Sequence, residues 1–266
     1  MAGQYIEPMQ PTAARPVSPP GRDRGWLRQS LQRIAWPCEV CGTWDASSLC
    51  GGCRQRFLAD QPPACPRCAL PSPGGQACGA CVRQPPAFVQ CVAAVPYGFP
   101  WDRLVARLKF QGQPEIAGIL AQVMAERLAV AGQPGASQPA HQPPADLVLP
   151  VPLSPARLAE RGYNQAWELA RRLAALRGLP AQPRALQRLR DTPHQVGLSR
   201  VERQRNLRDA MWVDPQTITL AGRHVALVDD VMTTGGTAAA CTQALLAAGA
   251  ASVQVWVLAR TPPPEH

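Results

Sequence analysis

The sequence predicts an α/β protein with a mainly parallel sheet flanked by helices, preceded by a small N-terminal domain held together by metal. Two observations predict this architecture. From about Phe88 to Arg260, short apolar stretches alternate with segments in which apolar residues recur every three or four positions, as in strands joined by helices. Before them, eight of the ten cysteines fall in close pairs within 44 residues, a spacing typical of metal ligands.

Length and proline content indicate how the chain is divided. The 266 residues suffice for one full α/β domain and a smaller one. Thirty prolines are too many for uninterrupted regular structure, and clusters of them lie near the N-terminus, in a low-complexity insertion and at the C-terminus. We therefore predict a flexible or weakly structured segment at 1–35, a double zinc ribbon at 36–86, and an α/β domain at 87–262 with the insertion at 131–145.

The net charge of +9 comes almost wholly from arginine, because Lys109 is the only lysine. Such an excess suits a phosphate-bearing or nucleic-acid partner, although a general bias toward arginine and alanine explains it equally well. No stretch approaches the roughly 18 apolar residues of a membrane span, and the N-terminus lacks the apolar core of a signal peptide. We expect a cytoplasmic protein without a membrane span.

The paired cysteines form four Cys-x-x-Cys units, and two such units complete a tetrahedral shell of four sulfurs. Eight ligands therefore suit two structural zinc ions. Gaps of eight and nine residues within the successive halves favour sequential sharing of the pairs, with interleaved sharing as the alternative. The predicted ligands are Cys38, Cys41, Cys50, Cys53, Cys65, Cys68, Cys78 and Cys81.

Other uses of these cysteines fit the sequence less well. A disulfide framework belongs to oxidising compartments, and thioredoxin-like redox chemistry needs one Cys-x-x-Cys motif rather than four. A shell of four thiolates has no open coordination position, so the predicted zinc is structural and not catalytic. Whether the ribbons bind nucleic acid or a partner protein, or only brace the fold, stays open.

The α/β region reads as strands alternating with helices. Asn164 is a suitable N-cap and Gly178 a suitable stop for one of these helices. The alternation predicts a mainly parallel sheet covered on both faces. We expect strands at 87–97, 146–153, 211–213, 223–230 and 252–260, and helices at 101–112, 116–130, 164–178 and 237–250.

The stretch VALVDDVMTTGGT at 225–237 indicates where a ligand binds. We expect Val225 to Val228 to form a central strand that ends on Asp229 and Asp230. The following loop opens a helix, whose first N–H groups and dipole favour an anion. Ligands of open α/β sheets bind at this carboxyl end of the strands, so the loop predicts a phosphate site.

The two aspartates must act on another part of the ligand, because they would repel a phosphate. Each carboxylate can accept a hydrogen bond from a ribose hydroxyl, and carboxylates help to hold Mg²⁺ near a pyrophosphate. The sequence has neither a Walker P-loop nor a Rossmann glycine fingerprint. A plain strand–turn–helix would explain the glycines but not the adjacent acids. The pattern predicts a site for a ribose phosphate.

These residues resemble the signature of type I phosphoribosyltransferases: an apolar run, two acids, then Thr-Thr-Gly-Gly-Thr. The resemblance implies the type I phosphoribosyltransferase fold and the ligand phosphoribosyl pyrophosphate with Mg²⁺. Asp229 and Asp230 would be the catalytic acids and bind the ribose hydroxyls. The residues implied to hold the 5′-phosphate are Thr233, Thr234, Gly235, Gly236 and Thr237.

From about Cys38 to Arg260 the chain is similar to the ComF family, also called ComFC, which joins a zinc ribbon to a transferase-like domain and is associated with DNA uptake in natural competence. The similarity extends to RLKFQG at 107–112, VPLSPARLAERGYNQ at 151–165 and TPHQVGLSRVERQRN at 192–206. It implies that the segment after the first core strand binds pyrophosphate, through Pro152, Arg161, Gly162 and Asn164.

The similarity also places the arginine-rich region at 188–208 where related transferases carry a flexible loop that closes over the substrate. A solvated basic face explains Arg161 and that region equally well. For Lys109, an extended side chain on an amphipathic helix and phosphate binding are both open.

Two hypotheses for the function follow. In the first, the protein transfers phosphoribose from phosphoribosyl pyrophosphate to a nitrogen acceptor, with catalysis by positioning and electrostatics. In the second, it is a non-catalytic module that binds single-stranded DNA or a competence helicase through the zinc ribbon and the arginine-rich surface. Arginine–phosphate contacts to DNA weaken steeply with salt, which distinguishes the two. The acceptor base and the oligomeric state are not encoded in any recognisable motif.

Overall fold

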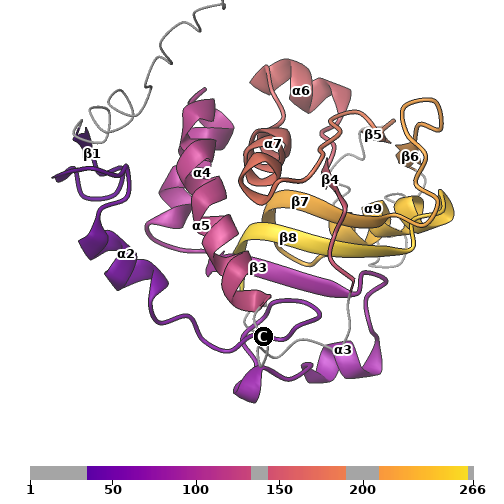
Figure 1. The fold of residues 1–266 in the computed structure, drawn as a ribbon, viewed down its shortest axis with the longest axis horizontal. Coiled ribbons are helices and arrows are strands. Elements are labelled where there is room, and N and C mark those ends of the chain that lie inside the picture. The colour runs from indigo at the N-terminus through magenta and orange to yellow at the C-terminus, as the bar shows by residue number, and fades with distance from the viewer. Residues whose placement is uncertain (1–34, 133–142, 190–209, 263–266) are drawn as a thin grey trace, which may run out of the picture.

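The centre of the fold is a four-stranded parallel sheet in the order β3-β8-β7-β4 (Figure 1). The computed structural model describes residues 35–132, 143–189 and 210–262. Within these, the sheet strands are β3 (Gln90–Pro96), β4 (Leu147–Pro150), β7 (His224–Met232) and β8 (Ser252–Arg260). The parallel sheet flanked by helices confirms the predicted fold class.

The two middle strands are longer than the edge strand beside them. β7 and β8 pair from His224 opposite Ser252 to Met232 opposite Arg260. β4 pairs with β7 only as far as Pro150 opposite Val228. The carboxyl-terminal part of β7 therefore has a strand neighbour on one side only.

Helices cover both faces of the sheet, as predicted. α4 (Trp101–Phe110), α5 (Ala117–Ala131) and α7 (Gln165–Arg177) lie on one side, and α9 (Gly236–Ala247) lies on the other (Figure 1). Each face has its own apolar cluster. One contains Leu108, Leu120, Leu173 and Val228, and the other contains Leu149, Leu227, Leu245 and Val255.

The predicted limits of α7 are confirmed by its caps. The Asn164 side chain accepts hydrogen bonds from the backbone N–H groups of Ala166 and Trp167, which would otherwise lack partners. At the other end, Gly178 adopts a left-handed conformation with φ +66°, which glycine allows at low cost.

Several elements differ from the sequence prediction. The strand predicted at 211–213 exists as β6 (Met211–Val213), but it pairs antiparallel with β5 (Leu186–Arg188) in a separate small sheet. Sequence reasoning predicted neither β5 nor α6 (Pro155–Arg161), because their short polar sequences lack a clear period. A short 3₁₀ turn, η2 (Pro114–Ile116), leads into α5.

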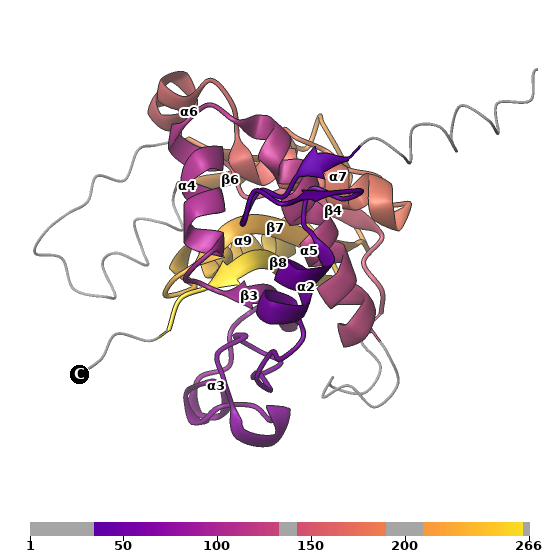
Figure 2. The same cartoon turned by 90° about the vertical axis from the view of Figure 1, so that its left-hand side faces the viewer.

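The cysteine-rich segment consists of short elements in two parts. The first part contains β1 (Trp36–Pro37), β2 (Trp44–Asp45) and α2 (Gly51–Leu58), and the second contains η1 (Pro73–Gly75) and α3 (Gly79–Arg83). Figure 2 shows the part with α2 beside α5, and the part with α3 extending below β3. All but the last residue of the predicted flexible segment at 1–35, and most of the insertion at 131–145, lie outside the described residues.

The first part of this segment shares its core with the sheet domain. Leu49 is only 1% exposed and belongs, with Cys53, to the apolar cluster that contains Leu108 of α4. Glu39 also forms an ion pair of 2.7 Å with Arg107 of α4. The fold therefore provides no separate core for the first two Cys-x-x-Cys units.

Leu49→Ala is expected to destabilise the whole protein because it opens a cavity in this shared core. We expect a loss of about 3 kcal/mol in the free energy of unfolding, measured by denaturant unfolding of the full chain. As the control, Trp44→Ala in the same segment alters a side chain that is mostly exposed and should cost less than about 1 kcal/mol. Equal, small effects of both substitutions would contradict a shared core.

Candidate functional site

The paired aspartates lie within β7, beyond the last residue of β4. The strand was expected to end at Asp230, but it continues to Met232 because Val231 pairs with Ala259 and Met232 with Arg260 of β8. On the other side, the final link to the β4 chain is the hydrogen bond from the Val151 N–H to the Val228 carbonyl, at 2.8 Å. The acids therefore lie at a step in the sheet edge, where one neighbouring strand has ended.

Asp230 is almost fully buried, at 2% exposure, and is paired with the only lysine. The Lys109 Nζ atom from the end of α4 lies 2.8 Å from Asp230 Oδ2. This contact is an ion pair by distance but is not aligned as a hydrogen bond, and Oδ2 has no hydrogen-bond partner among the described residues. The other oxygen, Oδ1, accepts a hydrogen bond from the Val231 N–H at 2.8 Å. Oδ2 therefore keeps an unused acceptor position.

Asp229 is partly buried and lies close to its neighbour's negative charge. Burial raises the pKa of the Asp229 carboxyl well above its usual range, and the Asp230 carboxylate raises it further. The Asp230 N–H and the Lys109 ammonium act in the opposite direction. The single lysine thus offsets only part of the unfavourable charge, and a ligand that supplies hydroxyl donors or a cation would stabilise this pair.

The predicted phosphate loop connects β7 to α9. Gly235 is the N-cap of α9, with φ +80°, and as a glycine it has no side chain to cap the helix. The first N–H groups of a helix have no intrahelical partner, so this end can bind an anion. Thr233 and Thr234 are exposed, and the Thr234 hydroxyl accepts only a long hydrogen bond of 3.4 Å from the Gly236 N–H. The helix begins at Gly236, one residue before the predicted start.

The segment that follows β4 brings the other four predicted site residues to the carboxyl end of the sheet. Pro152 is buried just after β4, and Gly162 ends α6 in a left-handed conformation with φ +76°. The Asn164 amide donates to the Val151 carbonyl at 3.0 Å while its oxygen caps α7. The Arg161 guanidinium donates to Gln165 Oε1 at 2.9 Å.

The end of α4 packs over this segment and carries Lys109 to the acids. The Tyr163 hydroxyl donates a hydrogen bond to the Leu108 carbonyl, and the Arg161 guanidinium lies 5.2 Å from the centre of the Phe110 ring. The two expectations for Lys109 were phosphate binding and extension toward solvent. The structure instead shows an ion pair with Asp230.

The eight paired cysteines form two clusters in chain order, which is the pairing that their spacing favours. Within each group of four, all Sγ atoms lie within 4.8 Å of one another. The Sγ atoms of Cys41 and Cys50 are 3.6 Å apart, and those of Cys68 and Cys78 are 3.7 Å apart. A tetrahedral zinc site with bonds of about 2.3 Å gives sulfur separations of about 3.8 Å. Both clusters therefore have the size of a zinc site.

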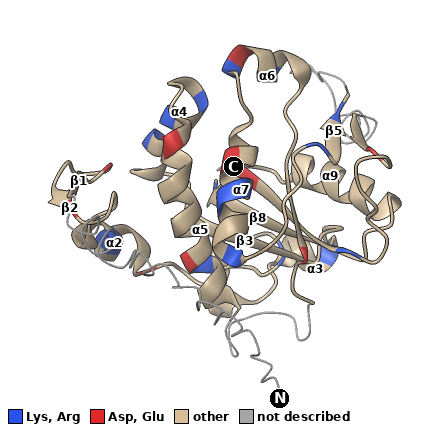
Figure 3. Cartoon of the chain, turned by 45° about the horizontal axis from the view of Figure 1, so that its top comes forward, with Lys and Arg blue, Asp and Glu red and all other residues tan. Residues whose placement is uncertain are grey.

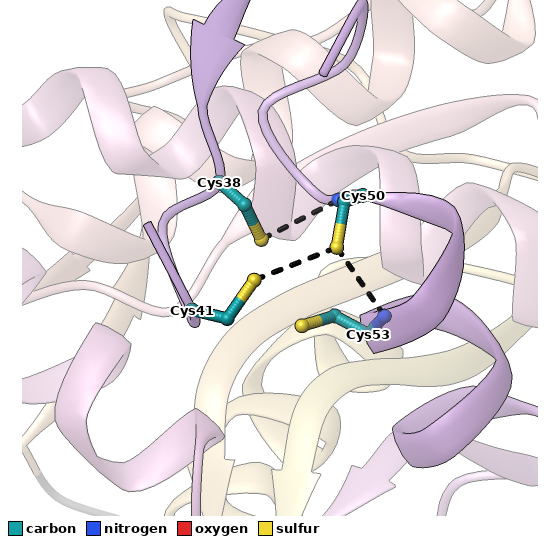
Figure 4. Close-up of side chains that lie close together, drawn as sticks. All are labelled: Cys38, Cys41, Cys50 and Cys53. Atoms are coloured by element: carbon teal, nitrogen blue, oxygen red, sulfur yellow. Dashed lines mark hydrogen bonds between the residues drawn. The ribbon is translucent and has the colours of Figure 1, made fainter. Parts of the chain in front are cut away.

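Backbone groups also prepare the first cluster for a metal. Figure 4 shows the four side chains directed toward a common centre. The Cys50 N–H donates to Cys38 Sγ and the Cys53 N–H donates to Cys50 Sγ, both at 3.4 Å. Hydrogen bonds with the hydroxyl and backbone of Thr43 lower the pKa of the exposed Cys41 thiol to about 6, so that it is a thiolate at neutral pH, the form that binds metal.

Sequence reasoning missed two contacts made by cations. It did not pair Lys109 with Asp230, although a lone lysine near the end of an amphipathic helix was a visible signal. It assigned no role to Arg260, which is buried at the end of β8. The arginine-rich region was predicted to close over the substrate, and all but 188–189 of it lies outside the described residues.

Comparisons with known proteins agree with this geometry. The family described as a phosphoribosyl transferase domain matches residues 158–265. A purine phosphoribosyltransferase from Pyrococcus horikoshii aligns over 53% of this chain and 70% of its own, with 15% identity and a TM-score of 0.32. Among the described residues, no helix is long and apolar enough to cross a membrane.

The fold and site define a phosphoribosyltransferase-like protein with two N-terminal clusters of four cysteines. "DNA utilization protein YhgH" of Escherichia coli K12 is 34% identical over 233 residues, which cover 86% of this chain and 97% of that protein. "Competence protein F" of Haemophilus influenzae is 34% identical over 216 residues, which cover 80% and 91% of the two chains. The chain belongs to the ComF family.

Asp229→Asn is expected to stabilise the protein in the absence of ligand. Since burial raises the Asp229 pKa, folding is opposed above the unfolded-state pKa of about 4, and this cost persists at pH 7. An amide avoids the cost, and its oxygen can still accept the hydrogen bond from the Asp230 N–H. We expect the melting temperature at pH 7 to rise by about 2–4 °C, which corresponds to about 1 kcal/mol.

Two controls accompany this measurement. Asp230→Asn removes the partner of Lys109 and should give no such rise. The difference between Asp229→Asn and wild type should shrink as the pH falls below about 4, where the aspartate becomes protonated in both states. A lower melting temperature for Asp229→Asn at pH 7 would show that the ionised side chain stabilises the fold.

Proposed function

We propose that the protein binds phosphoribosyl pyrophosphate with Mg²⁺ at the carboxyl end of the sheet. Asp229 and Asp230 would accept hydrogen bonds from the ribose hydroxyls, and the loop from Thr233 to Thr237 would hold the 5′-phosphate. The observation that carries this proposal is the order of two features along the chain: a buried carboxylate oxygen that has an ion pair with Lys109 but no aligned hydrogen bond, followed by a helix start whose N-cap is a glycine. A ribose phosphate fits both features.

The carboxylates also fit a magnesium ion. Asp230 Oδ2 is a hard oxygen with a free acceptor position, of the kind Mg²⁺ prefers. Bound Mg²⁺ would supply positive charge that stabilises the pyrophosphate as it leaves. Before any ligand binds, the Lys109 ammonium already neutralises the charge of one of the two carboxylates. The acid pair therefore repels a polyanionic ligand less strongly.

The residues after β4 would shape the pyrophosphate side of the site. We propose that Asn164 acts indirectly, because its side chain is occupied by the cap of α7 and by the Val151 carbonyl. It would thereby fix the backbone at Pro152 and Gly162. Arg161 keeps a cationic group at this end, and its contact with Phe110 links its position to α4.

We propose transfer of the phosphoribosyl group to a nitrogen acceptor as the reaction. The bond from ribose C1 to the pyrophosphate oxygen would break, with the electron pair leaving on pyrophosphate, and a bond from C1 to nitrogen would form. The described residues would contribute by holding the ribose and the 5′-phosphate in place and by stabilising charge, with no covalent intermediate on the protein.

The names of the relatives support a link to DNA. They are called a DNA utilization protein and a competence protein, and this chain carries a net charge of +9. Figure 3 shows basic residues on α2, α4 and α6. We propose a role in the uptake or use of DNA in natural competence. Direct binding of single-stranded DNA or of a helicase, without catalysis, is the second candidate function.

We also propose that each four-cysteine cluster holds one structural zinc ion. The sulfur separations and the N–H to sulfur hydrogen bonds support this assignment. The segment at 36–86 would then be a double zinc ribbon whose first half is packed against α4 and α5. With four protein ligands per ion, neither zinc would have an open position for a substrate.

Calorimetric titration with phosphoribosyl pyrophosphate and Mg²⁺ tests the central proposal. We expect wild type to bind, and the double variant Asp229→Asn, Asp230→Asn to lose at least about tenfold in affinity, because each carboxylate accepts a charge-assisted hydrogen bond. The double variant should bind a single-stranded oligonucleotide as wild type does, with affinity that falls steeply as salt rises. A folded, zinc-loaded wild type that binds only the oligonucleotide would favour the second candidate function.

Lys109→Met is expected to shift the midpoint of the pH dependence of ligand affinity to a higher pH. Binding requires ionised acids, so affinity should fall as the pH drops through the raised Asp229 pKa. Because Lys109 lowers that pKa, its removal should shift the midpoint of the affinity–pH profile to higher pH. Lys109→Arg keeps the charge and should shift it much less. An unchanged midpoint in Lys109→Met would show that the lysine does not act on the acid pair.

A further inference from the structure

Arg260 is a buried cation whose hydrogen bonds all go to backbone carbonyls. Its side chain ends β8 at 8% exposure, and none of the ion pairs between described residues includes it. A buried guanidinium is costly unless its donors are satisfied. Its Nη1 donates to the carbonyls of Met232 at 2.9 Å, Thr261 at 3.0 Å and Thr233. Its Nε donates to the Cys68 carbonyl at 2.9 Å.

These carbonyls belong to two parts of the chain that the sequence separates widely. Met232 and Thr233 form the end of β7 and the start of the predicted phosphate loop. Cys68 is one of the four cysteines of the second cluster. One side chain therefore joins the second cluster to the loop, and the planar guanidinium can do so because its donors diverge in a fixed geometry.

The second cluster is fastened to the sheet at the same place. The Cys91 N–H of β3 donates to the Pro66 carbonyl at 3.0 Å, and Pro66 lies within the Cys65–Cys68 turn. A metal bound to Cys65 and Cys68 would fix the shape of this turn, and with it the direction of the Cys68 carbonyl. The first cluster instead packs on α4 and α5, and its cysteines form no hydrogen bond with residues 232–237 in the described part of the chain.

We infer that Arg260 is a positioning residue for the phosphate loop, and that through it the metal in the second cluster, but not the first, sets the loop's affinity for a phosphate ligand. The inference rests on the proposed function for the identity of that ligand. When the second cluster loses its metal, the Cys68 carbonyl is no longer fixed, and Arg260 holds the start of the loop less firmly. The N-terminal segment would thus control the transferase-like site without contributing a residue to it.

The first test measures coupling between the two contacts. Arg260→Gln and Cys68→Ser should each lower the affinity for phosphoribosyl pyrophosphate with Mg²⁺ by about tenfold, a typical coupling. The double variant should be little worse than either single variant, since both act through one link. Arg260→Lys should restore part of the affinity. As the comparison, Cys41→Ser in the first cluster should also lose one zinc, but it does not act through Arg260, so any change that it causes in ligand affinity should add to that of Arg260→Gln. Additive effects of Cys68→Ser and Arg260→Gln would overturn the inference.

The second test uses wild-type protein and therefore does not depend on the folding of a cysteine variant. Coupling between two binding sites is reciprocal. Phosphoribosyl pyrophosphate with Mg²⁺ should therefore raise the protein's affinity for one of the two zinc ions by about the same tenfold, measured by competition with a chelator. Arg260→Gln should abolish this effect while both ions remain bound without chelator. Equal tightening of both ions, or of neither in a protein that binds the ligand, would contradict the inference.

Hydrogen exchange separates failure of this inference from failure of the proposed function. If wild type does not bind phosphoribosyl pyrophosphate, the proposed ligand is wrong, but Arg260→Gln and Cys68→Ser should still speed amide exchange at 232–237 relative to β3. Unchanged exchange at 232–237 in both variants would overturn the inference whatever the ligand is.

Discussion

The parallel pairing of β7 with β8 is the constraint on which the rest of the site depends. These strands remain paired through Met232 and Arg260, four residues beyond the point where β4 stops. Because β4 is shorter than β7, the sheet edge has a step, and Asp229 and Asp230 lie at that step, at the carboxyl end of the sheet where the proposed ligand binds. The pairing also sets where the phosphate loop begins, because the loop starts where the ladder ends. A shorter β8 would leave both the acids and the loop without a fixed backbone.

Charges that are buried near this step are compensated by elements far away in the sequence. Lys109 comes from α4 to meet Asp230, while Arg260 reaches the carbonyls of two other segments. In each case a single cation fixes an arrangement that backbone pairing alone would leave open. The site is thus assembled from one long ladder and two cationic contacts, and each contact ties a helix or a cysteine turn to the end of β7.

How much of this could be predicted from sequence depends on the range of the interaction. The caps of α7, the four cysteine pairs and the apolar run of β7 are local patterns, and they gave the fold class, the clusters and the position of the candidate site. The true end of β7 lies two residues beyond the predicted end at Asp230, and it was missed because Val231 and Met232 are held in the ladder by pairing with β8, a contact between distant parts of the sequence. The small sheet of β5 and β6, the partner of Lys109 and the contacts of Arg260 were missed because they depend on tertiary proximity, which no periodicity reports.

The shared core around Leu49 has a consequence for how this architecture can change over time. The first cysteine cluster packs on α4 and α5. Replacing either the cluster or these helices with the homologous segment of a relative would therefore require compensating substitutions in the other. Substitutions on the contacting faces must therefore be inherited as compatible sets. A cysteine-rich segment of this kind is expected to diverge together with the helices beneath it, and not to move as an independent module between unrelated proteins.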